Sequence, residues 1–219
     1  MAALAEALAA VDSSEDARVV VISASGRLFC AGHDLAELRA AETSAERLAL
    51  FEQCSALMMS LSEYRLPVIA QVQGAAVAAG CQLVASCDLA YAAQSAKFAV
   101  SGINLGLFCS TPGVALGRAV GRRAAAEMLM SGRFIDAAEA VSIGLINRAV
   151  PDAELVGCVD EMAATLAAKP VDAMTLGKRI WRQQMSAPLA DAYAIASAAM
   201  AENLAFDSAR AGIDGFLKR

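Results

Sequence analysis

Two short stretches combine small residues with the expected start of a helix. In "FCAGHDL" (29–35) the backbone N–H of His33 lies near one helix start, and in "GAAVAAGCQ" (74–82) that of Ala79 lies near another. The first N–H groups of a helix have no acceptor within it and carry partial positive charge. Two such donors directed at one point would form an oxyanion hole. On shape alone, two ordinary tight strand-to-helix turns are the simpler interpretation.

The elements that would position these loops alternate between strands and helices. Helices are expected at 2–11, 43–64, 77–88, 112–132 and 136–144, and strands at 17–24, 66–74, 88–93, 97–100 and 146–151. The stretch 26–38 is expected to be a loop that opens into a short helix, and the chain after Pro151 to be almost wholly helical. Thr43 and Glu46 have the spacing of a capping box at the start of the long helix. This alternation implies an α/β fold with a mostly parallel sheet.

Composition excludes several classes of function. The 219 residues have a net charge of −5, which argues against a nucleic-acid partner. No apolar run reaches the roughly 18 residues that a membrane span needs, and no basic cluster suggests a membrane anchor. No signal peptide is visible at the N-terminus, so a cytoplasmic location of the bacterial type is expected.

The six cysteines show no CxxC pair and the chain has a single histidine, so no metal site is expected. Reduced, buried thiols are the simplest interpretation of these cysteines.

Four stretches occur in the order typical of one family. They are "RLFCAGHDL", "LPVIAQVQGAAVAAGCQLVASCDLAYAAQSAKFAV", "GLFCSTPGVALGRAVG" and "AAEMLMSGRFIDAAEAVSIGLINRAVP", followed by a helical tail. From about residue 15 onward, the chain resembles the crotonase (enoyl-CoA hydratase/isomerase) superfamily of acyl-CoA enzymes. Within it, the sequence is most similar to the branch of enoyl-CoA hydratase domain-containing proteins of mitochondria and their bacterial relatives.

The resemblance implies a crotonase-like spiral of ββα units over 1–151 and a C-terminal helical region, 152–219, that builds homotrimers, often paired into hexamers. It implies a coenzyme A thioester as substrate or ligand and no covalently bound cofactor. The thioester carbonyl would lie between the N–H groups of His33 and Ala79. The backbone around Ala31 would contact the adenine end of CoA.

Several neighbours of these loops have two interpretations. Asp34 and Leu35 could join the CoA-binding site, although Asp34 and Glu37 also suit the charge of a helix N-terminus. The imidazole of His33 is more simply a loop group than a base. The cationic tail residues offer either a solvated face or contacts to CoA phosphates; they are Lys178, Arg179, Arg182 and Lys218.

Relatives in this family start with a further strand pair, whereas this chain begins at what resembles the following helix. Either the start was assigned too late, or part of the first sheet and some CoA contacts are absent. A mitochondrial location is expected only if a missing N-terminal segment carried a transit peptide.

The resemblance also points to a change in chemistry. Hydratases of this family use two glutamates, and the corresponding positions here are Gln82 and Gly102. Hydration needs a base for the water and an acid for the α-carbon, and each such group contributes typically about 10²–10⁴-fold. An amide can hold water but cannot take its proton. We therefore expect hydratase activity to be weak or absent.

The loop "FCSTPG" faces the acyl group in relatives, so Leu105 and Cys109 are expected in the pocket. Ser110 matches the position of a nucleophilic carboxylate in a dehalogenase branch, but nothing near it in sequence would activate it. A reactive Cys109 is a weaker interpretation than a packed thiol. Two alternatives to a hydratase therefore remain: another thioester or enolate reaction, such as hydrolysis, decarboxylation or isomerisation, and a non-catalytic acyl-CoA-binding subunit.

Overall fold

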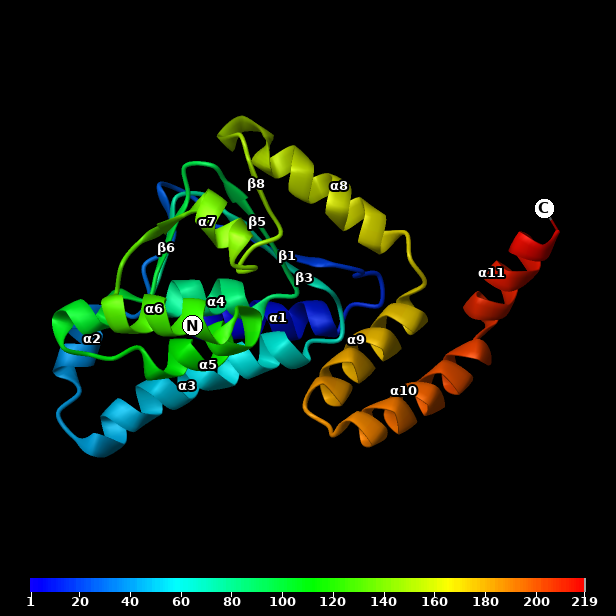
Figure 1. Cartoon of the computed structure of the whole chain (residues 1–219), viewed down its shortest axis with the longest axis horizontal. Coiled ribbons are helices and arrows are strands. Elements are labelled where there is room, and N and C mark those ends of the chain that lie inside the picture. The colour runs from blue at the N-terminus through cyan, green and yellow to red at the C-terminus, as the bar shows by residue number, and fades with distance from the viewer. Residues whose placement is uncertain (219) are drawn as a thin grey trace.

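Two four-stranded sheets form the centre of the protein, and helices surround them (Figure 1). The computed structural model describes residues 1–218. The first sheet contains, in spatial order, β1 (Val20–Ile22), β3 (Val68–Val72), β5 (Leu89–Ala93) and β8 (Arg148–Val150), all parallel. The second contains β2 (Leu28–Cys30), β4 (Ala75–Val77), β6 (Lys97–Ala99) and β7 (Ile135–Asp136), with the β6–β7 pair antiparallel.

Each early turn of the chain contributes one strand to each sheet and then a helix. The pairs are β1–β2, β3–β4 and β5–β6, so the order is strand, strand, helix. The helices are α1 (Ala2–Asp12), α2 (Leu35–Ala40), α3 (Ser44–Glu63), α4 (Ala79–Ser86), α5 (Ser110–Ala119), α6 (Arg122–Ser131), α7 (Ala137–Ser142), α8 (Leu155–Ala167), α9 (Val171–Met185), α10 (Leu189–Leu204) and α11 (Asp207–Leu217). Two 3₁₀ helices are η1 (Ser101–Leu105) and η2 (Asp152–Glu154).

Two short strands, β2 and β4, were not predicted from the sequence. They form where the chain passes from the first sheet to the second. The expected strand 66–74 ends at Val72, and the chain turns through Gly74, whose φ is +66°, into β4. A Cβ at Gly74 would lie 2.0 Å from the carbonyl oxygen of Arg27, so the turn before β2 packs directly against it. The expected loop 26–38 therefore contains β2, and the second sheet forms by alignment of these two turns.

Helix predictions were mostly confirmed. Thr43 and Glu46 form the expected capping box, with hydrogen bonds in both directions. The single helix expected over 112–132 was wrong, because the chain leaves helical geometry at Val120 and Gly121 and forms α5 and α6. Gly144, with φ of +82°, follows the end of α7 as expected.

The first sheet is buried on both faces. On one side lies the main core, which includes Leu61, Val68 and Val72. On the other side α8 packs Leu155 and Val159 against Ile69, Tyr91 and Ala93. Double-sided burial is typical of parallel sheets and explains the continuous apolar run of β3.

The last helices run away from the sheets (Figure 1). Helix α10 packs against α9, and α11 contacts both of them. Their large apolar residues are mostly exposed; these are Trp181, Met185, Leu189, Tyr193, Met200, Leu204, Ile213, Phe216 and Leu217. The division into a core of 1–151 and an oligomerising region of 152–219 stays a prediction. Over the described residues, no helix is both long and apolar enough to cross a membrane.

Candidate oxyanion site

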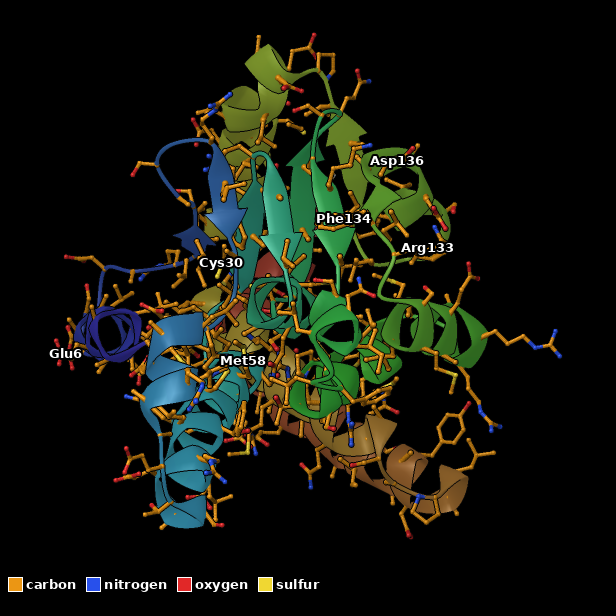
Figure 2. All side chains as sticks on the ribbon, turned by 90° about the vertical axis from the view of Figure 1, so that its left-hand side faces the viewer. Glu6, Cys30, Met58, Arg133, Phe134 and Asp136 are labelled. Atoms are coloured by element: carbon orange, nitrogen blue, oxygen red, sulfur yellow. The ribbon has the colours of Figure 1, made fainter. Side chains whose placement is uncertain are left out.

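The two loops predicted from the sequence lie against each other. A Cβ at Gly32 would lie 3.2 Å from the Cβ of Ala78 and from the backbone nitrogen of Ala79. A Cβ at Gly80 would lie 2.1 Å from the carbonyl oxygen of Cys30. Figure 2 shows Cys30 where the strands give way to the helices. The two backbones are so close that only glycine fits at Gly32 and Gly80. The two strand-to-helix turns predicted from the sequence are present, and the fold brings them into contact.

The second loop has an unusual backbone at Ala78. Its φ of 50° and ψ of −114° make it the only described non-glycine residue with positive φ. Its N–H donates to the carbonyl of Ala99 at 2.8 Å, and its carbonyl accepts from Gln82 N at 3.0 Å. Such strain persists only where surrounding structure holds it, and it is concentrated at functional sites. Here it sets the direction of the peptide that carries the Ala79 N–H.

Both predicted donors lack a hydrogen-bond acceptor among the described residues. Ala79 is the first residue of α4, where an N–H has no acceptor within the helix. Across the described residues, neither the N–H of Ala79 nor that of His33 donates to another group of the chain. Unpaired N–H groups on two loops in contact are one of the features that an oxyanion hole requires.

Gln82 lies on the same helix, one turn after Ala79. Its side chain is only 4% exposed, and its Oε1 accepts a hydrogen bond from Cys54 Sγ of α3 at 3.8 Å. Burial, with a smaller contribution from Cys30, raises the pKa of the Cys54 thiol, so the thiol keeps its proton. The pair is therefore neutral and offers no acid or base for hydration.

Gly102, in η1, has no room for a side chain. A Cβ there would lie 2.3 Å from the carbonyl oxygen of Leu107 and 2.9 Å from Cys109 Sγ. The Gly102 N–H donates to Cys109 Sγ at 3.3 Å, and Leu107 N donates to the Gly102 carbonyl at 3.0 Å. The returning backbone fills the space where a glutamate would begin. A carboxylate could be restored at this position only by moving the main chain.

The His33 side chain turns toward α3. Its ring meets Phe51 edge to face, with 5.5 Å between the ring centroids. Its Nε2 is fully enclosed and has no hydrogen-bond partner among the described residues. The backbone and the side chain of His33 therefore occupy different environments.

The flanking residues of the first loop are exposed, and Asp34 already has a structural partner. Its Oδ1 accepts from Ala36 N at 2.8 Å and caps α2. Ala31 and Leu35 are exposed on either side. This cap agrees with the interpretation of Asp34 as a helix N-terminal charge, and contact with CoA stays a prediction for all three residues.

The acyl-side residues differ in exposure. Cys109 is buried and engaged with Gly102, whereas Leu105 is 70% exposed, beside exposed Leu107 and Phe108. Ser110 begins α5, is exposed, and its Oγ makes a long, 3.5 Å contact to the Phe108 carbonyl. No described base hydrogen-bonds to Ser110, so the fold does not supply the activation that the sequence also lacked.

A model of the enoyl-CoA hydratase/isomerase family matches residues 1–219. The chain belongs to this family. Enoyl-CoA hydratase domain-containing protein 3, mitochondrial, of Homo sapiens is 45% identical over 206 residues, which are 94% of this chain and 68% of that protein. The Rattus norvegicus protein of the same name is 44% identical over 94% of this chain and 69% of its own.

Solved structures agree in fold. The crystal structure of an enoyl-CoA hydratase of Mycobacterium smegmatis superposes with a TM-score of 0.97 at 48% identity, covering 99% of this chain and 84% of that chain. That of human enoyl-CoA hydratase domain-containing protein 3 gives 0.92 at 44% identity, covering 96% and 86%. The crotonase-like fold and the resemblance to the hydratase domain-containing branch are thus confirmed.

The structure of this family member also contains an ionic network, after α4, that was not predicted from the sequence. Asp88, two residues after α4, binds Lys178 Nζ at 2.5 Å and Arg182 Nη2 at 2.7 Å, both from α9. Lys178 also donates to the Leu66 carbonyl at 2.6 Å, and Asp88 accepts from Val68 N.

This network corrects the interpretation of two tail cations. Lys178 and Arg182 are four residues apart on one helical face and are paired with Asp88, so neither is simply a solvated cation. Burial lowers the pKa of Lys178, and Asp88 opposes that shift. The spacing of the two cations was visible in the sequence, but their partner lies about 90 residues away.

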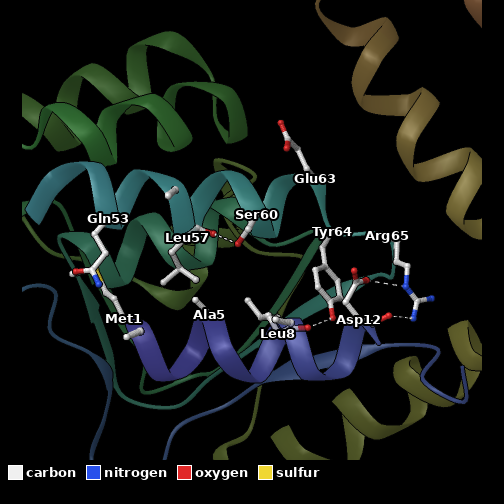
Figure 3. Close-up of a pocket in the computed structure, with 13 residues that line it drawn as sticks. Met1, Ala5, Leu8, Asp12, Gln53, Leu57, Ser60, Glu63, Tyr64 and Arg65 are labelled. Atoms are coloured by element: carbon white, nitrogen blue, oxygen red, sulfur yellow. Dashed lines mark hydrogen bonds and ion pairs between the residues drawn. The ribbon is translucent and has the colours of Figure 1, made fainter. Parts of the chain in front are cut away.

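A cavity of about 560 Å³ lies elsewhere, between α1 and α3 (Figure 3). Apolar residues such as Ala5 and Leu57 line most of it, and an Arg65–Asp12 ion pair closes one end. The Tyr64 hydroxyl donates to the Leu8 carbonyl at 2.7 Å. None of the residues predicted for the acyl-CoA site lines this cavity.

Proposed function

We propose that the protein binds an acyl-CoA and polarises its thioester carbonyl between the N–H groups of His33 and Ala79. The contact between the two loops carries this proposal, because it places two unpaired N–H donors on adjacent backbones. Family membership supports a CoA thioester as the ligand. Hydration is weak or absent, because Gln82 is an amide held by a thiol and Gly102 is enclosed by backbone.

The carbonyl contact is tested by comparing butyryl-CoA with S-butyl-CoA, a thioether of the same length without the carbonyl. Net hydrogen bonds of about 0.5–1.5 kcal/mol each predict that two such bonds favour the thioester by roughly tenfold or more. Calorimetric titration measures both affinities. Equal affinities would refute the oxyanion hole.

The side chain of His33 can report binding of the thioester carbonyl by NMR. His33 is the only histidine, so its imidazole gives one set of NMR signals. Butyryl-CoA should shift these signals, because the backbone N–H of the same residue donates to the thioester carbonyl, whereas free CoA should shift them less.

The predicted lack of hydration is tested by following the loss of enoyl-thioester absorbance with crotonyl-CoA. Ordinary enzyme rates in the wild type would contradict our interpretation of Gln82 and Gly102.

A second candidate function is non-catalytic acyl-CoA binding. The closed backbone at Gly102 favours it, because neither family carboxylate is present. Binding of butyryl-CoA without release of free thiol, and without turnover of crotonyl-CoA, would support this candidate. Thiol release from butyryl-CoA would instead support hydrolysis.

A homotrimer or hexamer stays part of the proposal, supported by the exposed apolar residues of α9, α10 and α11. Analytical ultracentrifugation measures the oligomeric state.

The names of the curated relatives are compatible with a mitochondrial location. The cytoplasmic location stays a prediction.

A further inference from the structure

The last three helices, α9–α11, form an arm that has little apolar contact with the rest of the protein (Figure 1). Among the described residues of this arm, the buried ones are Leu176 of α9 with Ala192 and Ala199 of α10, and α11 has none. Val171 is partly buried and packs against the main core. Hydrophobic contact is not directional. So few apolar contacts do not by themselves fix the angle at which the arm leaves the core.

The ionic network of Asp88 supplies directional contacts between the arm and the first sheet. Lys178 Nζ donates to Asp88 Oδ2 at 2.5 Å and to the Leu66 carbonyl at 2.6 Å. Arg182 Nη2 donates to Asp88 Oδ1 at 2.7 Å. Asp88 is itself fixed, because its Oδ2 accepts from Val68 N at 2.8 Å and its N–H donates to the Val68 carbonyl at 3.0 Å. The core therefore presents a fixed carboxylate, where β3 and β5 begin, to two cations of α9.

These charges are removed from water to different extents. The Lys178 side chain is only 8% exposed, whereas those of Asp88 and Arg182 keep about a quarter of their surface. Removing one partner of a buried ion pair leaves an uncompensated charge, which is strongly unfavourable. A docked arm that lacks one partner therefore pays this cost, whereas a released arm returns the remaining charge to water. Buried ion pairs are best attested as devices that select one arrangement over others.

We propose that Asp88, Lys178 and Arg182 form a latch that sets the orientation of the arm on the core. With all three side chains charged, the arm is docked. Loss of the charge on Asp88 or Lys178 releases it, while the two sheets and the helices around them stay folded. Lys178 is the inner contact of the latch and Arg182 the outer one. The latch lies at the opposite end of α4 from Ala79, and its action involves no ligand.

The test is amide hydrogen exchange of the full chain, followed by mass spectrometry of fragments from the arm and from the core. Asp88→Asn keeps an oxygen for the Val68 N–H and removes the charge. Exchange in α9 should become faster by roughly tenfold or more, because a released helix opens more often. Exchange in α3 and α8 should keep the wild-type rate. Unchanged exchange in α9, or equal acceleration in α3 and α8, would overturn the latch.

Lys178→Met breaks the latch from the side of the arm, with an apolar side chain of similar length. It should accelerate exchange in α9 as Asp88→Asn does, and it decides the matter if the Asn variant does not fold. The double variant should add little to either single change, because both remove the same contact. Fully additive effects would mean that the two residues act independently and would contradict the proposal.

Glu127→Gln is the matched control. It also removes one carboxylate charge, from an ion pair with Arg133 at α6, away from the arm. Exchange in α9 should keep the wild-type rate in this variant. Acceleration of α9 in the control as well would trace the effect to net charge and would remove the argument for a latch.

The chain has a single tryptophan, Trp181, which lies on α9 between the two latch cations and is 63% exposed. Its fluorescence anisotropy therefore reports the motion of the arm directly. In the wild type the decay should follow the tumbling of the whole protein, and Asp88→Asn and Lys178→Met should add a large fast component. A decay that is unchanged in both variants would contradict release of the arm.

Oligomeric state is a separate readout, and it alone rests on the proposed homotrimer or hexamer. Analytical ultracentrifugation should show that Asp88→Asn shifts the protein toward the monomer, because the exposed apolar residues of the arm lose their fixed orientation. A monomeric wild type would refute the oligomer. Hydrogen exchange and Trp181 anisotropy would then still decide the latch, so the two proposals fail in different measurements.

Discussion

The two loops of the site provide the same group, a free N–H, by different means. The first turns at Gly32, with φ of +98°, and leads into the six-residue helix α2, which has no buried residue. The second turns at Ala78, with φ of 50°, and leads into α4, where seven of eight residues are buried. The first relies on glycine geometry and a side-chain cap. The second relies on packing that holds a strained alanine in place.

The largest effect is expected where the two loops touch. Gly80→Ala places a Cβ 2.1 Å from the Cys30 carbonyl, so α4 or β2 must shift. We expect a loss of about 3 kcal/mol in the free energy of unfolding, at the upper end for overpacking. Urea unfolding measures it. Gly117→Ala in α5 is the control: no atom lies within 4 Å of its Cβ, and about 0.5–1 kcal/mol should be gained. Equal responses would mean that the loops are not in close contact.

Gly32→Ala tests the first loop alone. Positive φ costs a non-glycine residue about 1–2 kcal/mol, and the new Cβ presses on the Ala79 nitrogen at 3.2 Å. Stability should fall by that amount, and affinity for butyryl-CoA should fall by up to about 30-fold, since two misplaced bonds are each of order 1 kcal/mol. Gly26→Ala has similar backbone strain, with φ of +89°, but open space around it. It should lose stability and keep affinity; a matching loss of affinity would remove the link between Gly32 and the hole.

Asp34→Ala removes the cap of α2 and should cost about 1 kcal/mol of unfolding free energy. Asp34→Asn keeps the capping oxygen and should recover most of it. Titration with butyryl-CoA adds a second readout. Weaker binding by the Asn variant, at unchanged stability, would give the carboxylate a role in ligand binding beyond the cap.

The smallest effect is expected at Ala78→Gly. Glycine accepts the positive φ without strain, but it also gains freedom in the unfolded chain, and the two terms are each about 1 kcal/mol or less. The net change in unfolding free energy should stay within about 1 kcal/mol, measured by thermal and urea unfolding. A large loss would show that the Ala78 methyl group, and not the surrounding packing, supports the second loop.

Local patterns predicted much of the fold. The capping box at Thr43 and Glu46 depends on neighbours three residues apart, so it was readable from the sequence. Three-residue strands such as β2 and β4 were not, because they form only when the turns at Arg27 and Gly74 meet. The break at Gly121 between α5 and α6 was missed, because a single glycine in a helical pattern is often tolerated and residues on both sides of it favour a helix.

By itself the sequence determined the chemical types at the site: two small-residue turns, an amide at Gln82 and no side chain at Gly102. Tertiary structure decided what those types do. In the folded protein the two turns are in contact, and the backbone of Leu107 fills the space beside Gly102. The side-chain oxygen of Gln82 accepts a hydrogen bond from Cys54, 28 residues earlier. Tertiary structure also paired Asp88 with cations about 90 residues later. The reason is physical: residue types fix which bonds can form, but burial and contacts distant in sequence decide which of them do.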